Sequence, residues 1–246
     1  MDEEIIRKRM AFFRKVPVFV TVREDDLRAI STQFRARNYG KKEIIFHQGD
    51  ETHDFYLIKR GKVRVFCNSP SGNETSIRVL SANEMIGEFA PIDGQPRSAT
   101  AQAITDCTLL ELPQEGFLRC LREQPNFTMT LLRLLVQKLR MMTEYAETIA
   151  QYDIGGRLLH IILCYNAKIG KEIEQNKCYE VDLGLNQGDL ASMVGARREW
   201  VNHLLSQWRK QGLIAFSRGR ITILDLPAVE AERDRRIELL SENDQW

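Results

Sequence analysis

The stretch GEFAPIDGQPRSATAQA, residues 87–103, places one acidic and one basic side chain around a loop that contains glycine and proline. Glu88 directly follows Gly87, and Arg97 comes nine residues later, next to Ser98. Strand-like segments stand on both sides of the loop. Two interpretations are open: an ion pair that closes a surface turn, or a pocket for a ligand that carries hydroxyl groups and a negative charge.

The region around this stretch, residues 37–113, has the pattern of a small β domain. Runs rich in β-branched and aromatic residues recur about every ten residues, with turn-forming residues between them. The runs are EIIFHQ, DFYLIKR, KVRVFC, TSIRVL, ATAQAI and TLLEL. This spacing predicts an antiparallel barrel or a double-sheet jelly roll.

After Pro113 the pattern becomes helical, and a long helix is predicted over 125–152. Positions spaced alternately by four and three residues are mostly apolar, as at the a and d positions of a coiled coil. They predict a parallel dimer through Leu131, Leu135, Met142, Tyr145, Ile149 and Tyr152. The alternative is an amphipathic helix that lies on its own barrel. Lys138 also falls on this seam, where we expect it to weaken the pairing.

A helix-turn-helix is predicted in QGDLASMVGARREWVNHLLSQWRKQG, residues 187–212. Ala191 is small enough for two helices to cross closely, and Gly195 suits the sharp turn between them because a β-carbon there is expected to clash. Apolar residues at the expected positions bury the contact between the helices. Two strands follow, joined at 217–220, and form a predicted wing.

The predicted outward face of the second helix and the wing carry the residues expected to contact DNA. These are Arg197, Arg198, Glu199, Asn202, His203, Arg218 and Arg220. Six basic and two acidic residues between 187 and 223 give this segment a charge of +4, which suits binding to phosphates. A solvated helix face is the alternative for any single arginine. Trp200 is expected to be partly buried and to pack rather than to stack on a base.

Composition limits the class of protein. The chain has 246 residues, of which 43% are hydrophobic and 28% charged, and a formal net charge of +1. This length predicts two domains. No apolar run reaches the ~18 residues of a membrane-spanning helix, and the N-terminus does not have the pattern of a secretory signal. We therefore expect a cytoplasmic protein with no membrane partner.

The reactive side chains show no spacing that is typical of a metal or catalytic site. The five cysteines have no C-x-x-C pair, and the four histidines have no H-x-x-x-H pair. We find no catalytic triad, Walker loop or paired acid/base carboxylates. Reduced thiols, no metal site, no obligatory cofactor and no catalytic residues are expected, so the chain is not predicted to be an enzyme.

A β domain, a long helix and a winged helix-turn-helix, in this order, resemble the cyclic AMP receptor protein/FNR (CRP/FNR) family of bacterial transcription regulators. The resemblance rests on three segments: 56–61, the cassette formed by 87–90 with 96–99, and 195–205. It implies an α+β fold with an effector domain over 1–124, a dimerisation helix over 125–152, and a DNA-binding domain with an acidic tail over 153–246.

The resemblance also implies a ligand and the residues that hold it. The cassette is similar to the phosphate-binding cassette of cyclic-nucleotide domains, with Arg97 and Ser98 at the cyclic phosphate and Glu88 at the ribose hydroxyl. The expected ligand-binding residues are Gly87, Glu88, Phe89, Arg97, Ser98, Ala99 and Thr143. Cyclic AMP is the expected effector, with cyclic GMP as an alternative. Members that bind cyclic AMP have two adjacent hydroxyl residues where this chain has Met142 and Thr143, and an arginine where it has His203.

These features predict a homodimeric regulator that activates or represses transcription at a two-fold-symmetric site on double-stranded DNA. RNA polymerase is an expected partner if the protein is an activator. Two alternatives stay open: a family member that binds DNA with no nucleotide effector, and a cyclic-nucleotide-binding regulatory subunit that does not bind DNA. Because residues 1–66 contain no cysteine, the branch of the family that holds an iron–sulfur cluster is disfavoured.

Overall fold

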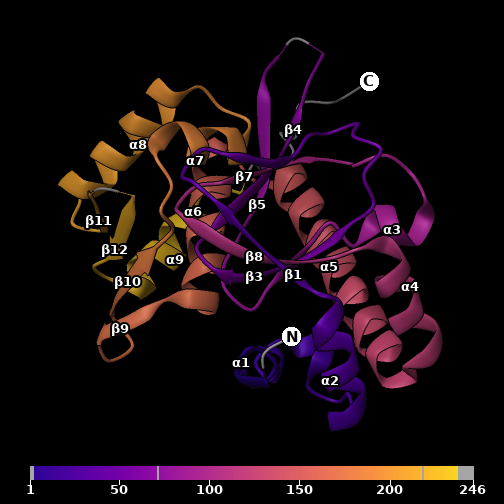
Figure 1. Ribbon diagram of the computed structural model, residues 1–246. Helices are drawn as coiled ribbons and strands as arrows, with labels where there is room; N and C mark the ends of the chain where they lie inside the picture. Colours follow the sequence, from indigo (N-terminus) through magenta and orange to yellow (C-terminus); the bar gives the residue numbers. More distant parts are fainter. Residues whose placement is uncertain (1–2, 71, 218, 238–246) are drawn as a thin grey trace. The chain divides into compact units, whose positions relative to one another are not determined.

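The computed structural model describes residues 3–70, 72–217 and 219–237, and divides the chain into two units, Met1–Leu139 and Arg140–Trp246 (Figure 1). Each unit has its own sheets and core, and each is described by itself below. None of the helices in these described residues has both the length and the apolar content needed to cross a membrane.

The first unit is built on two four-stranded antiparallel sheets, as the turn spacing predicts. One sheet has the order β1-β8-β3-β6 and the other β2-β7-β4-β5. The strands are β1 (Arg35–Tyr39), β2 (Ile44–Phe46), β3 (Phe55–Arg60), β4 (Val63–Asn68), β5 (Glu74–Leu80), β6 (Met85–Ile86), β7 (Thr100–Ala103) and β8 (Cys107–Leu112). The double-sheet fold is confirmed.

Helices and a 3₁₀ turn complete this unit: α1 (Glu3–Phe13), η1 (Pro17–Phe19), α2 (Glu24–Gln33), α3 (Phe89–Asp93), α4 (Gln114–Glu123) and the first half of α5 (Pro125–Gln151). Helix α4 packs on α2 and α3 (Figure 1). A cluster of aromatic side chains lies between these helices and β3. Within it, Phe117 stacks on Phe55 with ring centroids 4.8 Å apart, and Phe19 lies 5.2 Å from Phe127 of α5. This cluster fixes the start of the long helix on the β domain.

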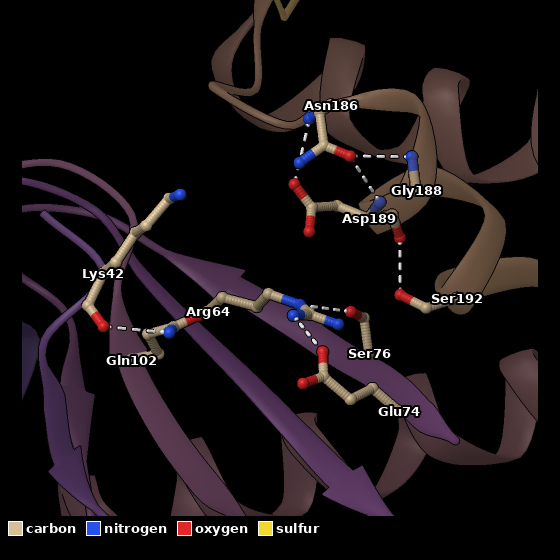
Figure 2. A network of polar contacts seen from close by, with 9 residues as sticks. All are labelled: Lys42, Arg64, Glu74, Ser76, Gln102, Asn186, Gly188, Asp189 and Ser192. Carbon is tan, nitrogen blue, oxygen red and sulfur yellow. Dashed lines mark hydrogen bonds and ion pairs between the residues drawn. The ribbon is translucent and has the colours of Figure 1, made fainter. Parts of the chain in front are cut away.

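A buried arginine ties β4 to β5 in the second sheet (Figure 2). Arg64 is 5% exposed and donates from Nε to the Ser76 hydroxyl at 2.6 Å. Its Nη1 donates to the Glu74 carboxylate, also at 2.6 Å. Because a buried charge is stable only when it is paired and hydrogen-bonded, this network belongs to the structure of the sheet.

The second unit contains the predicted winged helix-turn-helix. After the end of α5, this unit contains α6 (Ile154–Ile169), β9 (Lys171–Glu174), β10 (Cys178–Asp182), α7 (Gln187–Val194), α8 (Arg198–Lys210), β11 (Ile214–Ser217), β12 (Arg220–Ile223) and α9 (Leu226–Asp234). The strands form one antiparallel sheet in the order β11-β12-β10-β9. Helix α9, which includes part of the predicted acidic tail, packs on α6. Residues 238–246 lie outside the described residues.

Local sequence explains why α7 begins and ends where it does. The Asn186 side chain accepts hydrogen bonds from the backbone N–H groups of Gly188 and Asp189, at 2.7 and 3.1 Å (Figure 2). The Asp189 carboxylate in turn accepts from the Asn186 backbone N–H at 2.9 Å, which completes a capping box. At the other end, Gly195 has a φ of +69°, a conformation that favours glycine.

Gly195 is needed for its backbone conformation and not for space. A β-carbon added there meets no atom within 4 Å, so the expected clash is wrong. Ala191 is 3% exposed where α7 packs on α8, as the crossing of two helices requires.

Candidate functional sites

The cassette between β6 and β7 brings Gly87 against the Arg97 guanidinium. Gly87 has a φ of +75°, and a β-carbon at this residue would lie 2.6 Å from Arg97 Nη1. The same Nη1 donates to the Gly87 carbonyl at 3.0 Å. A glycine is therefore required here both by the backbone angle and by the close approach of the arginine.

Arg97 is 3% exposed, and neutral groups hold its guanidinium in one orientation. Nε donates to the Thr52 hydroxyl at 3.1 Å, and Nη2 donates to the Asp54 carbonyl at 2.7 Å. The guanidinium carbon lies 4.3 Å from the centre of the Phe46 ring, at cation–π distance. Burial lowers the pKa of Arg97, and nearby ionisable groups, among them the Asp54 carboxylate, oppose this shift through space.

Glu88 does not pair with Arg97, the alternative that the sequence left open beside a ligand pocket. Its side chain is 5% exposed, and its partner is the ammonium of Lys138 from α5. Lys138 Nζ also lies 5.9 Å from the centre of the Phe89 ring. Lys138 was expected to weaken a dimer seam; in the structure its side chain turns toward the cassette, where it compensates a buried carboxylate.

The other predicted ligand residues differ in how accessible they are. Ser98 is exposed, Ala99 is buried, and Phe89, the first residue of α3, is 43% exposed. Thr143 is an exposed residue of α5 that belongs to the second unit, and its part in a ligand site stays a prediction.

The exposed face of α8 carries the residues predicted to contact DNA. Val201, Leu204, Leu205 and Trp208 are buried against the rest of the unit, which turns other residues of the helix outward. Arg197, Arg198, Glu199, Asn202 and His203 are all exposed. Asn202 accepts a hydrogen bond from the Gln187 side chain at 3.0 Å, so its amide is held in one orientation.

The wing is only partly described. Arg220 begins β12 and pairs with Glu180 of β10 at 3.1 Å, while both side chains keep contact with solvent. Arg218 lies outside the described residues. A role in DNA binding stays a prediction for each of the two arginines.

Trp200 was expected to be partly buried and to pack rather than to stack on a base, and in the structure about half of it is exposed. The side chain is 51% exposed and stacks on His203, with ring centroids 5.9 Å apart and planes inclined by 25°. The buried tryptophan of this helix is Trp208, which has no exposed surface. Because the buried positions of α8 are 201, 204, 205 and 208, helical periodicity could have placed Trp200 at the edge of the buried face.

Three residues of the predicted dimer seam make contacts within the unit to which they belong. Leu131 is 2% exposed in the aromatic core of the first unit, and the half-buried Leu135 packs on the same core. Tyr145 donates its hydroxyl hydrogen to the Met193 carbonyl of α7 at 2.5 Å, and burial raises the pKa of this tyrosine. The buried Leu131 therefore does not fit a dimer interface, whereas the half-buried Leu135 and Tyr145 stay predictions for one.

The other seam residues are more accessible. Met142 and Ile149 are 55% and 44% exposed and stay predictions for a dimer interface. Tyr152 is half-buried and forms a β-bridge with Ile237. A different stripe on the first half of α5 consists of large apolar residues that are 50–64% exposed: Met129, Leu132, Val136 and Leu139.

The cysteines and histidines form no metal site among the described residues, where no group of three or more His, Cys, Asp or Glu could hold an ion. The five cysteines are free thiols. Burial raises the pKa of Cys120 to about 12, which keeps this thiol protonated and unreactive.

Comparison with known proteins gives two family matches. Residues 36–124 match the cyclic nucleotide-binding domain, and residues 156–232 match the Crp-like helix-turn-helix domain. The first segment contains the cassette, and the second contains α7, α8 and the wing.

Whole proteins of similar length are also related to this chain. The cyclic AMP receptor protein of Thermus thermophilus is 26% identical over 218 residues, which cover 87% of this chain and 95% of that protein. The global nitrogen regulator of Synechococcus elongatus is 28% identical over 216 residues, 83% of this chain and 96% of that protein. A solved structure of a CooA mutant from Carboxydothermus hydrogenoformans covers 82% of this chain and 88% of its own, with a TM-score of 0.71 and 24% identity, and so supports the fold.

Proposed function

Because this chain belongs to the CRP/FNR family of DNA-binding transcription regulators, we propose that it binds a cyclic nucleotide, cyclic AMP first, and that this ligand controls its binding to DNA. The family consists of regulators and not of enzymes. The effector, the residues that bind it, the DNA contacts and the dimer interface are the parts of the proposal that experiments must test.

One observation carries the effector part: Arg97 is a buried cation whose three hydrogen bonds all go to neutral oxygens. These acceptors orient the guanidinium but do not neutralise it, and a buried charge is costly until an opposite charge meets it. A cyclic phosphate carries one negative charge and two free oxygens, and a guanidinium offers a planar set of donors that fits them.

Neighbouring groups suit the remainder of a cyclic nucleotide. Ser98 is exposed beside Arg97 and offers a hydroxyl donor to the phosphate. Glu88 pairs with Lys138, and its side-chain oxygens can accept a hydrogen bond from the ribose 2′-hydroxyl. A deoxyribose analogue lacks this hydroxyl, so we expect it to bind more weakly than the ribonucleotide.

The Lys138–Glu88 pair also favours a second candidate, a regulator that binds DNA without a nucleotide. Here the ammonium replaces the ligand as the partner of Glu88, so this carboxylate needs no nucleotide. The two candidates differ in whether the carboxylate exchanges its partner when a nucleotide is present.

Calorimetric titration with cyclic AMP and cyclic GMP tests the effector part. We expect binding by the wild-type protein, weaker binding of the 2′-deoxy analogue, and a loss of at least about tenfold in affinity for Arg97→Gln. Thermal unfolding of the variant shows whether its fold is kept. If neither nucleotide produces heat with the folded wild-type protein, the effector-free candidate replaces the first one.

The DNA part of the proposal places the exposed face of α8 in the major groove. Arg197 and Arg198 meet phosphates or guanine, and Glu199 accepts from cytosine, as such side chains do in other recognition helices. Selection from a random duplex pool, followed by affinity measurements at several salt concentrations, tests this part. Binding that does not weaken with salt would contradict it, because phosphate contacts release counterions.

We propose that a homodimer forms through the exposed stripe of α5. Met129, Leu132, Val136 and Leu139 follow one another by three, four and three residues, which is the spacing of a coiled-coil seam. A dimer would present two recognition helices about 34 Å apart to a two-fold-symmetric DNA site. As a regulator of transcription it would work in the cytoplasm, and RNA polymerase would be its partner if it activates.

A further inference from the structure

The recognition helix α8 carries two tryptophans with opposite environments. Trp208 has no exposed surface and packs in the core of the unit, whereas Trp200 is 51% exposed. The exposed ring offers a large apolar surface that a partner can cover, and burial of such a ring is strongly favourable. Trp200 lies between Glu199 and Val201, in the first turn of the helix predicted to enter the DNA groove.

Helix geometry places Trp200 on the edge of the outward face. Successive residues turn by about 100°, so Trp200 lies about 60° around the helix from His203 and about 100° from Glu199. The residues opposite the buried face are Glu199, His203 and Ser206. When Glu199, His203 and Ser206 face the base edges in the major groove, the side of the helix that carries Trp200 faces the wall of the groove. This wall consists of deoxyribose and phosphate.

The stack with His203 holds the indole ring in place. The two rings lie nearly parallel, at 25°, with centroids 5.9 Å apart. An indole has an apolar face and one N–H group that can only donate. A deoxyribose next to a phosphate oxygen offers the matching apolar surface and acceptor. Arg197 and Arg198, both exposed within three residues of Trp200, attract the same phosphates.

We propose that Trp200 is a DNA-contacting residue whose ring packs on a deoxyribose while its Nε1–H donates to a phosphate, and that His203 positions the ring. This inference rests on the proposed binding to DNA and adds a contact that carries no base preference. It also assigns His203 a role beside Trp200, in place of the arginine that the family resemblance implies at this position.

The test compares Trp200→Ala, Trp200→Phe and the wild-type full-length protein on a duplex selected from a random pool, with cyclic AMP present and absent. We expect Trp200→Ala to lose affinity by on the order of tenfold, by the same factor on the selected duplex and on each of its single-base variants. Trp200→Phe should recover part of this loss because the ring remains and the donor is gone.

Two further measurements make the test specific. In a Trp246→Phe background, the change in indole fluorescence on DNA addition should disappear with Trp200→Phe, since the remaining Trp208 is buried. Ile173→Ala is a matched control, because Ile173 is a 61% exposed apolar residue on β9, outside the recognition helix, and should leave DNA affinity unchanged. All variants should unfold at the wild-type temperature.

Each contrary result has its own meaning. If the wild type binds the duplex and Trp200→Ala binds equally well, the inference is wrong. A loss confined to one base pair would overturn the backbone contact in favour of an apolar contact with a thymine methyl group. If the wild type binds no duplex even at low salt, the proposed function itself fails, and this inference fails with it.

Discussion

Gly87 and Gly94 have almost the same backbone conformation in very different surroundings. Their φ values are +75° and +69°, but a β-carbon on Gly87 would meet Arg97 Nη1 at 2.6 Å, whereas one on Gly94 meets no atom within 4 Å. Alanine at either position therefore has the same backbone strain, about 1–2 kcal/mol. Only at Gly87 does it also displace the guanidinium.

We predict that Gly87→Ala weakens nucleotide binding by at least about tenfold, while Gly94→Ala destabilises the unit to a similar extent and keeps the wild-type affinity. Thermal unfolding and calorimetric titration of both variants check this. Equal affinities in the two variants would show that the position of the Arg97 guanidinium does not control the site.

We expect His160 to make the stability of the second unit depend on pH. It lies half-buried on α6, with its Nε2 atom 3.3 Å from Cys164 Sγ and its ring 6.2 Å from that of Tyr152. Burial lowers the pKa of His160 below the ordinary value of 6.5; Arg233 acts in the same direction, and Glu144 opposes it. The folded protein therefore resists protonation that the unfolded chain accepts.

The sign of the effect follows from this difference. Above pH 6.5, His160 is neutral in both the folded and the unfolded protein, and its full contribution to the free energy of unfolding is present. As the pH falls from 6.5 toward the lower pKa of the folded state, the unfolded chain takes up the proton first. The free energy of unfolding therefore decreases over this range. We predict that His160→Gln reduces the fall in melting temperature between pH 7.5 and 5.5. Parallel curves for wild type and variant would refute this.

At the scale of elements, the Lys138–Glu88 pair attaches α5 to the cassette. Glu88 is 5% and Lys138 23% exposed at the side chain, so removing the ammonium leaves a buried carboxylate without its partner. We predict that Lys138→Met lowers the free energy of unfolding of this unit by about 2–4 kcal/mol. Lys138→Met combined with Glu88→Gln should recover much of the loss, because no charge then remains unpaired.

An exposed ion pair provides the matched control for this prediction. Lys8 and Glu4 lie one turn apart on α1 at 2.5 Å, with side chains 68% and 56% exposed. Lys8→Met should change stability by less than about 0.5 kcal/mol. Chemical denaturation of both variants separates the two cases, and similar small losses would show that burial of the Glu88 carboxylate has little energetic weight.

The elements themselves could be predicted because local sequence determines them. Strand and turn patterns indicated the double sheet, and the small Ala191 with Gly195 indicated the helix-turn-helix. The face of α5 could not be assigned in this way. Its first half has one apolar stripe through Leu131 and Leu135 and another through Leu132 and Val136, and spacing alone does not tell which stripe packs on the barrel.

In the candidate site, too, some features could be predicted from the sequence and others could not. Motif order identified Gly87 and Arg97, which the structure brings into contact. The partner of Glu88 was missed because it lies fifty residues away on another element. The exposure of Trp200 was missed because aromatic composition says nothing about which side of a helix is covered; the positions of its buried neighbours do.

At the scale of the whole molecule, the exposed stripe of α5 predicts how the chain assembles. Val136 is 50% exposed at its centre. We predict that Val136→Glu converts the dimer into monomers, because two carboxylates would enter an apolar seam, and that affinity for a two-fold-symmetric DNA site falls by on the order of a hundredfold. Gln137→Glu adds the same charge at the adjacent exposed position and should leave both properties unchanged.

Sedimentation and DNA titration of the two variants check this prediction. A Val136→Glu protein that remains dimeric would show that another surface, such as the one containing Met142 and Ile149, holds the subunits together.

The contact of Lys138 with Glu88 has a consequence for the sensitivity of the regulator. In the proposed mode of nucleotide binding, the sugar hydroxyl would compete with the Lys138 ammonium for the Glu88 carboxylate. The strength of that competition would then set the nucleotide concentration at which the proposed regulator responds. A shorter or uncharged side chain at this one position would move the response threshold while the DNA site and the regulated genes stayed the same.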